Sequence, residues 1–126
     1  MNITQTAVSL NVPDVEASAD FARTHFGYTE AMSAEGFVSL QHAGTGSHLI
    51  FLATGLPTFK PREAAGSAGD GLLLVCVVDG IDAEFQRIEA AGARVVTSPE
   101  TEPWGERYCQ FADPNGIIWQ LVEWVA

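Results

Sequence analysis

The sequence has few basic residues, few cysteines and no long hydrophobic run. Its 126 residues include six Lys and Arg against sixteen Asp and Glu, a formal net charge of −10. Nucleic-acid backbones are bound by basic surfaces, so this balance argues against a nucleic-acid partner. No apolar stretch approaches the roughly 18 residues needed to cross a bilayer, and no N-terminal segment resembles a signal peptide. We therefore expect a cytoplasmic protein that binds neither nucleic acid nor membrane.

The two cysteines, Cys76 and Cys109, lie within apolar, strand-like runs. In a reducing compartment such residues usually behave as small buried hydrophobes, so we expect two free thiols and no disulfide. Because 47% of the residues are apolar, the chain can build a sizeable core. Residues 1–126 are therefore expected to form a single domain.

The first part of the chain has the periodicity of a strand followed by a helix. Residues 4–12 (TQTAVSLNV) alternate polar and apolar side chains, which predicts a strand with one buried face. Asp14 is the predicted N-cap of a helix that ends at Gly27. Three short strands are then predicted at about 28–33, 37–42 and 47–52.

After a connector rich in Gly, Pro and Ala at about 54–70, the same order of elements is predicted again. A strand near 71–79 precedes a helix with Ile81, Phe85 and Ile88 on its inner face. Three more strands are predicted at about 94–98, 107–112 and 117–124.

An internal repeat accounts for this recurrence. The stretches AGTGSHLIFL (43–52) and DPNGIIWQLV (113–122) each place a turn glycine before a strand. The chain is therefore predicted to consist of two βαβββ modules, about 1–53 and about 71–126, with an α+β fold.

These patterns resemble the glyoxalase, bleomycin-resistance and extradiol-dioxygenase superfamily, the vicinal oxygen chelate proteins. The resemblance covers essentially the whole chain and implies that the mixed sheets of the two modules curl around a shared cleft. It also implies a homodimer. The stretches that carry it are LNVPDVEASADFARTHFGY (10–28), VVDGIDAEFQRIEAAGARV (77–95) and FADPNGIIWQLVEW (111–124), the last with a D-P-x-G turn before the final strand.

The resemblance also implies four metal-ligand positions, which fall on Ala7, Ile50, Leu73 and Gln120. Alanine, isoleucine and leucine cannot bind a metal ion, and one Gln amide oxygen is a weak, neutral ligand. We therefore expect neither a metal nor another cofactor, and we assign no catalytic residue.

The stretch EPWGERY (102–108) resembles a segment of the bleomycin-resistance proteins, in which a Trp and a Phe flank the flat part of a bound drug. The matching residues here are Trp104 and Phe37. Alternatively, Trp104 anchors its loop by packing on the connector, for example on Phe59. Trp119 is expected on the helix side of its strand.

Strand alternation predicts which side chains line the cleft together with Ala7 and Gln120. This surface is mostly apolar with a few polar groups, which is typical of a small-molecule pocket. His48 is its only ionisable group and has no evident catalytic partner, whereas His25 and His42 are expected at a helix surface and a strand end. The predicted ligand-binding residues are Phe37, His48, Ile50, Leu73, Trp104, Tyr108, Ile118 and Gln120.

These features favour a metal-independent binding protein that confers antibiotic resistance by sequestering an aromatic drug. The acidic charge could also steer a cationic drug toward the protein. One alternative is an enzyme of the superfamily, such as a lyase, isomerase or dioxygenase, with non-standard metal ligands or none. Another is a paralogue that binds a metabolite.

Overall fold

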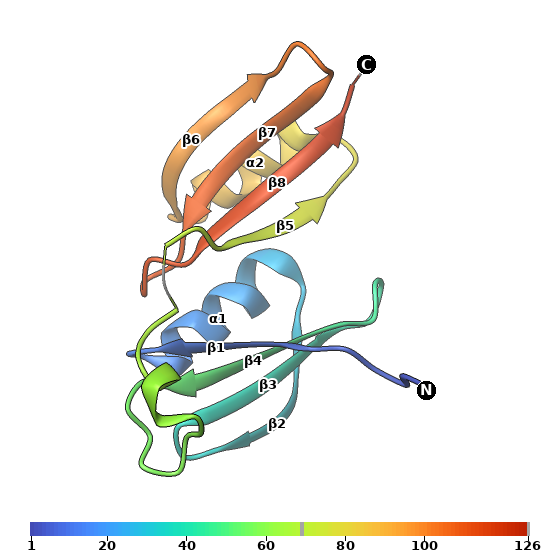
Figure 1. Ribbon diagram of the computed structural model, residues 1–126. Helices are drawn as coiled ribbons and strands as arrows, with labels where there is room; N and C mark the ends of the chain where they lie inside the picture. Colours follow the sequence, from blue (N-terminus) through green and yellow to red (C-terminus); the bar gives the residue numbers. More distant parts are fainter. Residues whose placement is uncertain (69, 126) are drawn as a thin grey trace. The chain divides into compact units, whose positions relative to one another are not determined.

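The computed structural model describes residues 1–68 and 70–125, and the chain divides into two compact units, Met1–Gly69 and Asp70–Ala126. Each unit contains a four-stranded sheet with one α-helix against one of its faces (Figure 1). The predicted α+β fold with two βαβββ modules is therefore confirmed. Within the described residues, no helix is long and apolar enough to span a membrane.

The first unit follows the predicted order of strand, helix and three strands. Its helix begins after Asp14, whose carboxylate accepts the backbone N–H of Ala17 at 3.1 Å, and it ends at Gly27, where φ is 72°. Both predicted caps are confirmed. The elements are β1 (Val8–Val12), α1 (Val15–Phe26), β2 (Thr29–Ala34), β3 (Phe37–His42), β4 (Ser47–Ala53) and the short 3-10 helix η1 (Arg62–Ala64).

Strand β1 is shorter than predicted. It pairs in parallel with β4 only from Val8 onward, where Val8 lies opposite Leu49. Leu10 and Val12 are buried, whereas Val8 is 46% exposed, so the predicted apolar face is buried only over its second half. The complete sheet has the order β1-β4-β3-β2.

Part of the connector is fastened to the first sheet by Asn11. The Asn11 Nδ2 group donates to the carbonyl oxygens of Ala64 at 3.0 Å and Gly66 at 3.1 Å. The backbone carbonyl of Asn11 accepts the N–H of Ala68 at 2.9 Å. Asn11 is only 8% exposed, so these bonds satisfy an amide that would otherwise be costly to bury.

The second unit repeats the same order, and its sheet has the equivalent strand order β5-β8-β7-β6. Strand β6 is longer than predicted, because it continues to Thr101 with two irregularities in its pairing with β7. The loop expected between the strands predicted at about 94–98 and 107–112 is therefore a tight turn over 102–105. The elements are β5 (Leu73–Val77), α2 (Ile81–Ala90), β6 (Arg94–Thr101), β7 (Glu106–Ala112) and β8 (Ile118–Trp124).

The core of the second unit lies between its sheet and α2. Ile81 and Ile88 of α2 are fully buried, and the ring of Phe85 stacks on that of Phe111 with centroids 5.3 Å apart. Phe111 lies opposite Trp119 in the β7–β8 pairing, and Trp119 is 1% exposed. The predictions for the inner face of α2 and for Trp119 are confirmed.

Both cysteines are free thiols on the second sheet, as expected. Cys109 is buried and Cys76 is half-buried, and this burial raises the pKa of each thiol to about 11. Both thiols are therefore protonated at neutral pH, when a reactive cysteine would need to be a thiolate.

The D-P-N-G turn before β8 is organised by Asp113. Its Oδ1 atom accepts the backbone N–H groups of Asn115 and Ile117, each at 2.9 Å, and the residue is 3% exposed. Gly116 has a φ of 84°, a conformation that residues with a side chain rarely adopt. The physical requirements of one tight turn thus explain both the Asp and the Gly of this motif.

The N-terminus of α2 is capped by a side chain of β8, the last strand of the unit. Gly80 stands at the N-cap and has no side chain to offer, so Glu123 of β8 supplies the acceptor. Its carboxylate accepts the N–H of Gly80 at 2.8 Å and that of Ile81 at 3.1 Å. These two bonds hold the pKa of Glu123 below its ordinary value.

Replacing Glu123 with Gln should lower the midpoint of thermal unfolding by a few degrees at neutral pH, because the helix N-terminus loses its charged acceptor. A carboxyl group whose pKa is depressed by folding stabilises the protein above its unfolded pKa, and this contribution is lost as the pH falls through the folded pKa. The difference between the wild type and Glu123→Gln should therefore shrink in acid. Circular dichroism melting curves from about pH 7 to about pH 3 measure it.

The matched control is Glu89→Gln, which removes an exposed carboxylate from α2 itself. This variant should melt like the wild type at neutral pH. If the melting temperatures of the wild type and Glu123→Gln differ as much in acid as at neutral pH, the ionised Glu123 carboxylate is not what stabilises the helix.

Candidate ligand-binding site

The open face of the second sheet carries a pocket of about 300 Å³ beside the β6–β7 turn. Because side chains alternate along a strand, the burial of Trp119 against α2 places its neighbour Gln120 on the opposite face. Tyr108 and Gln110 of β7 share that face through the β7–β8 register. The pocket is lined by Glu102, Trp104, Glu106, Tyr108, Gln110 and Gln120.

Trp104 forms a wall of this pocket and is 63% exposed, so it is not part of the core. Its Nε1–H donates to Glu106 Oε1 at 3.1 Å. The turn that carries it is closed by the N–H of Gly105 to the carbonyl of Glu102 at 2.9 Å and by the N–H of Glu102 to the carbonyl of Glu106 at 2.8 Å. Gly105 has a φ of 88°, which this turn requires. The indole is thus oriented by its N–H and presented from a well-defined turn.

Tyr108 binds two carboxylates with one hydroxyl group. Its O–H lies 3.0 Å from Glu102 Oε1 and 3.1 Å from Glu100 Oε2. The hydrogen bonds to Glu102 and then Glu100 raise the pKa of Tyr108 to about 12, because ionising the phenol would bring a third negative charge beside them. The hydroxyl therefore remains a donor and holds two acidic side chains at the pocket.

A chain of amide hydrogen bonds crosses the sheet beneath the pocket. The hydroxyl of Thr97 donates to Gln110 Oε1 at 2.7 Å, and Gln110 Nε2 donates to Gln120 Oε1 at 2.8 Å. In this arrangement each of the two amide oxygens accepts one hydrogen bond. The side-chain oxygen of Gln120 therefore accepts the bond from Gln110, and its NH₂ group can donate to another acceptor.

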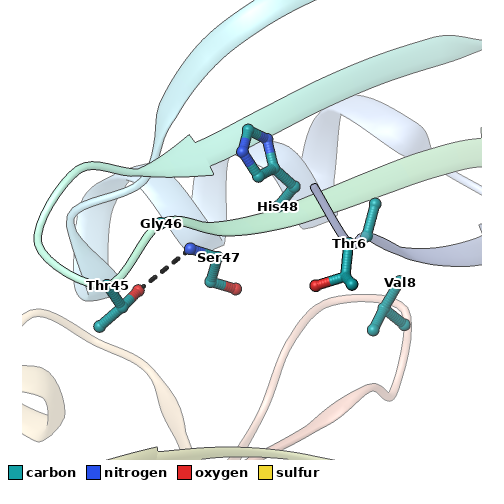
Figure 2. A pocket seen from close by; sticks show the side chains of 7 residues that line it. Thr6, Val8, Thr45, Gly46, Ser47 and His48 are labelled. Carbon is teal, nitrogen blue, oxygen red and sulfur yellow. Dashed lines mark hydrogen bonds between the residues drawn. The ribbon is translucent and has the colours of Figure 1, made fainter. Parts of the chain in front are cut away.

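A smaller pocket of about 240 Å³ lies in the first unit and includes His48. The imidazole of His48 and the side chain of Ser47 point to opposite sides of β4, and the Ser47 N–H donates to Thr45 Oγ1 at 3.3 Å (Figure 2). The described lining residues include neither a carboxylate nor a thiol, so His48 has no acid–base partner among them. They are Thr6, Ala7, Val8, Thr45, Gly46, Ser47 and His48.

Three of the eight predicted ligand-binding residues meet in the larger pocket, namely Trp104, Tyr108 and Gln120. Leu73 and Ile118 are register partners on the same open face but do not line the pocket. The roles of all eight stay predictions. In the first unit, Phe37, His48 and Ile50 lie on the face of β3 and β4 opposite the buried Val38, Leu49 and Phe51.

The prediction that His25 lies on the helix surface is wrong. The residue is 8% exposed, and its ring packs edge-on against Phe21 with centroids 4.6 Å apart. Phe21 and His25 are four residues apart and therefore share the inner face of α1. His42 lies at the end of β3 as expected, with its ring 5.3 Å from that of Tyr28.

Sequence reasoning missed the polar side chains around Tyr108. Glu106 and Gln110 lie two residues on either side of it, so alternation along β7 would have found them. Glu100 and Thr97 could not be found in this way, because their positions depend on the irregular register between β6 and β7.

The acidic groups of the larger pocket have no basic neighbour among its lining residues. Arg107 lies on the opposite face of β7 and pairs with Asp82 of α2, with 2.6 Å between Nη2 and Oδ1. This pair lowers the pKa of Asp82 and raises that of Arg107. The carboxylates around Trp104 and Tyr108 are therefore not neutralised by the arginine next to them in sequence.

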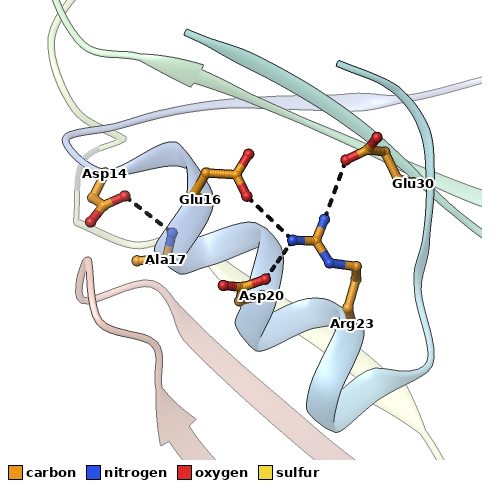
Figure 3. A network of polar contacts seen from close by, with 6 residues as sticks. All are labelled: Asp14, Glu16, Ala17, Asp20, Arg23 and Glu30. Carbon is orange, nitrogen blue, oxygen red and sulfur yellow. Dashed lines mark hydrogen bonds and ion pairs between the residues drawn. The ribbon is translucent and has the colours of Figure 1, made fainter. Parts of the chain in front are cut away.

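The surface of α1 shows the opposite arrangement. Arg23 is surrounded by the carboxylates of Asp20, Glu16 and Glu30, and the last two lie 3.3 and 3.6 Å from its guanidinium (Figure 3). The hydrogen bond that Arg23 donates to Asp20 is the main cause of the raised pKa of Arg23. Acidic residues on α1 are thus paired with a cation, whereas those at the pocket are not.

The side chains at the implied metal positions do not fit a metal ion. Gln120 lies opposite Val75 on β5, Leu73 lies opposite Ile118, and the Gln120 oxygen already accepts a bond from Gln110. Within residues 1–68 and 70–125, no group of three or more His, Cys, Asp or Glu side chains is placed to hold a metal ion.

Comparison with known proteins identifies relatives over most of the chain. A family model described as the Glyoxalase/Bleomycin resistance protein/Dioxygenase superfamily matches residues 3–121. Over 62 residues, 49% of this chain, the sequence is 45% identical to an uncharacterized protein of Mycobacterium bovis and to one of Mycobacterium tuberculosis. The match spans 41% of the first protein and 36% of the second, so the chain matches only about two fifths of these curated relatives.

Solved structures with the same fold include proteins of differing roles. A glyoxalase/bleomycin resistance protein/dioxygenase from Nocardioides has a TM-score of 0.78 at 27% identity, over 99% of this chain and 85% of that chain. TnmS3, an antibiotic binding protein from Streptomyces sp. CB03234, has a TM-score of 0.72 at 25% identity, over 98% of both chains. A lactoylglutathione lyase from Agrobacterium tumefaciens has a TM-score of 0.74 over 98% of this chain and 96% of that chain, and at 20% identity this likeness concerns the fold alone.

The pKa of Tyr108 offers a test of the pocket's hydrogen bonds. In a Tyr28→Phe background, which leaves Tyr108 as the only tyrosine, little tyrosinate absorbance should appear at about pH 10–11, where a free tyrosine ionises. Replacing Glu102 with Gln should lower the pKa toward its ordinary value and allow ionisation in that range. Ultraviolet difference spectra measure the effect, and circular dichroism confirms that the protein stays folded. If Tyr108 ionises equally with and without Glu102→Gln, the hydrogen bond between Tyr108 and Glu102 is contradicted.

Proposed function

The chain belongs to the glyoxalase/bleomycin resistance protein/dioxygenase superfamily, and on that premise we propose that it is a metal-independent binding protein for a small aromatic molecule. Binding, with no bond made or broken, sequesters the molecule from its target. TnmS3, the antibiotic binding protein that shares 25% identity over 98% of both chains, supports an antibiotic as the ligand.

The observation that carries this proposal is the presentation of Trp104. An indole that is 63% exposed, hydrogen-bonded through its N–H and mounted on a closed turn has a ring face available to a flat ligand. Stacking on such a ring adds about 0.5–1.5 kcal/mol beyond the burial of apolar area. Tyr108 provides a second aromatic surface in the same pocket of about 300 Å³.

The chemistry of the pocket favours binding over catalysis. Its described lining residues include no Ser, Thr, Cys or Lys to act as a nucleophile and no His to act as a base. Its carboxylates are engaged by Trp104 and Tyr108, and its amides by each other. These groups can orient a ligand and complement its charge.

Replacing Trp104 with Ala should weaken the binding of a planar aromatic amine by roughly 5- to 150-fold, which corresponds to about 1–3 kcal/mol of a lost aromatic contact. The probe is aminomethyl-fluorenone, and isothermal titration calorimetry measures its affinity. Because Trp104 is exposed, its removal should change the free energy of unfolding by no more than about 0.5 kcal/mol. A buried Trp would cost about 3–5 kcal/mol.

The matched control is Trp124→Ala, since Trp124 is 61% exposed and does not line the pocket. This variant should bind the probe like the wild type. Unchanged affinity in Trp104→Ala, or a large loss of stability in that variant, would contradict the stacking role. Treatment with a chelator should leave the affinity unchanged.

We further propose that the chain forms a homodimer, as the family resemblance implies. Strand β5 is an edge strand of its sheet, and its residues Leu73, Val75 and Val77 are 44%, 52% and 66% exposed. Proteins usually cover such apolar edges, and two-fold pairing is the commonest arrangement among homo-oligomers.

Light scattering at micromolar concentration should therefore give a mass near twice 13.5 kDa. Replacing Val77 with Lys should shift the protein toward the monomer, because a charge would be buried at the edge. Gln86→Lys, which adds the same charge on the exposed side of α2, should leave the mass unchanged. A wild type that is monomeric at these concentrations would contradict the dimer.

A further inference from the structure

The two ends of the pocket beside Trp104 differ in hydrogen-bonding character. At one end, Thr97 donates to Gln110 and Gln110 donates to Gln120, so the amide oxygen of Gln120 is occupied. Its Nε2 group has no acceptor among the described residues, although Gln120 lines the pocket. This end therefore offers an N–H donor, and the ligand group that complements it is an acceptor such as a carbonyl oxygen.

At the other end, the pocket offers only negative charge. Glu102 and Glu106 line it, and Glu100 adjoins it through the hydroxyl of Tyr108. The N–H of Trp104 and the O–H of Tyr108 are already donated to these carboxylates. Arg107 is turned away toward Asp82. The negative charge at this end therefore complements a cationic group on a ligand.

The strand geometry sets the distance between the two ends. Glu106, Tyr108 and Gln110 follow one another on the same face of β7, and each step of two residues advances the chain by about 6.6 Å. The acidic end and the amide end are therefore about 13 Å apart at the backbone, and their long side chains narrow this gap. A fused aromatic ring system spans such a distance while it lies against Trp104 and Tyr108.

From this polarity we infer that the ligand is an elongated planar aromatic with a carbonyl acceptor at the Gln120 end and a protonated amine at the end formed by Glu102 and Glu106. The inference rests on the proposed function, since it assigns the chemistry of the ligand in that same pocket. Gln120 is on this account a specificity-determining residue that selects for the carbonyl.

Three probes of nearly the same shape separate the two ends. Aminomethyl-fluorenone carries both polar groups, aminomethyl-fluorene lacks the carbonyl, and hydroxymethyl-fluorenone lacks the amine. Calorimetry with the wild-type protein should show the first binding most tightly. Loss of the carbonyl should weaken binding roughly 5- to 10-fold, the size of one net hydrogen bond. Loss of the amine should also weaken binding, and raising the salt concentration should weaken the two amine probes only.

Gln120→Glu is the variant for the donor end, because it keeps the shape and the acceptor for Gln110 while it removes the NH₂ group. It should bind aminomethyl-fluorenone roughly 5- to 10-fold more weakly and aminomethyl-fluorene no more weakly than the wild type does. Gln86→Glu adds the same charge on the exposed surface of α2 and should change neither affinity.

The acidic end is tested with the double variant Glu102→Gln, Glu106→Gln, which keeps acceptors for Tyr108 and Trp104. It should bind the two amine probes roughly 3- to 10-fold more weakly and leave hydroxymethyl-fluorenone unaffected. Glu84→Gln, Glu89→Gln removes the same charge from α2 as a control. Circular dichroism melting curves establish that each variant is folded.

The outcomes separate this inference from the proposed function. Equal affinity of the fluorenone and fluorene amines, or a Gln120→Glu variant that still prefers the carbonyl, would overturn the acceptor end. Equal affinity of the amine and hydroxyl probes would overturn the cationic end. If no probe binds, or if Trp104→Ala binds all three as tightly as the wild type, the proposed function itself fails and this inference fails with it.

Discussion

The packing of Trp119 against α2 is the constraint on which the rest of the second unit depends. This side chain is 1% exposed, next to Phe111, whose ring stacks on Phe85 of the helix. Since successive side chains on a strand face opposite ways, burying Trp119 commits Gln120 to the open face. A shift of β8 by one residue would exchange the two, so the largest core residue of the strand also sets the register of the pocket.

Carboxylates in the second unit serve either structure or the pocket, according to the side of the sheet on which they lie. On the helix side, Glu123 caps α2 and Asp82 pairs with Arg107. On the open side, Glu102 and Glu106 accept bonds from Tyr108 and Trp104 and meet no cation among the lining residues. The one arginine of β7 is used on the helix side, and the pocket keeps its negative charge for that reason.

Much of the fold could be predicted because it follows from local patterns. The alternation along the strands, the capping role of Asp14 and the glycines at positive φ each depend on residues a few positions apart. Prediction failed where a neighbour distant in sequence sets the outcome. Strand β1 starts late because its pairing with β4 begins only at Val8, and β6 runs past its predicted end because it continues to pair with β7.

The sequence by itself determined the two βαβββ repeats and the open face that holds Gln120, since periodicity is a local property. Only the tertiary structure decided that Glu123 caps a helix more than 40 residues earlier, that Asn11 holds the connector, and that Glu100 and Glu102 converge on Tyr108. These contacts join segments whose spacing along the chain carries no period. They form because packing of the sheet brings the segments together and because buried or crowded polar groups then require partners.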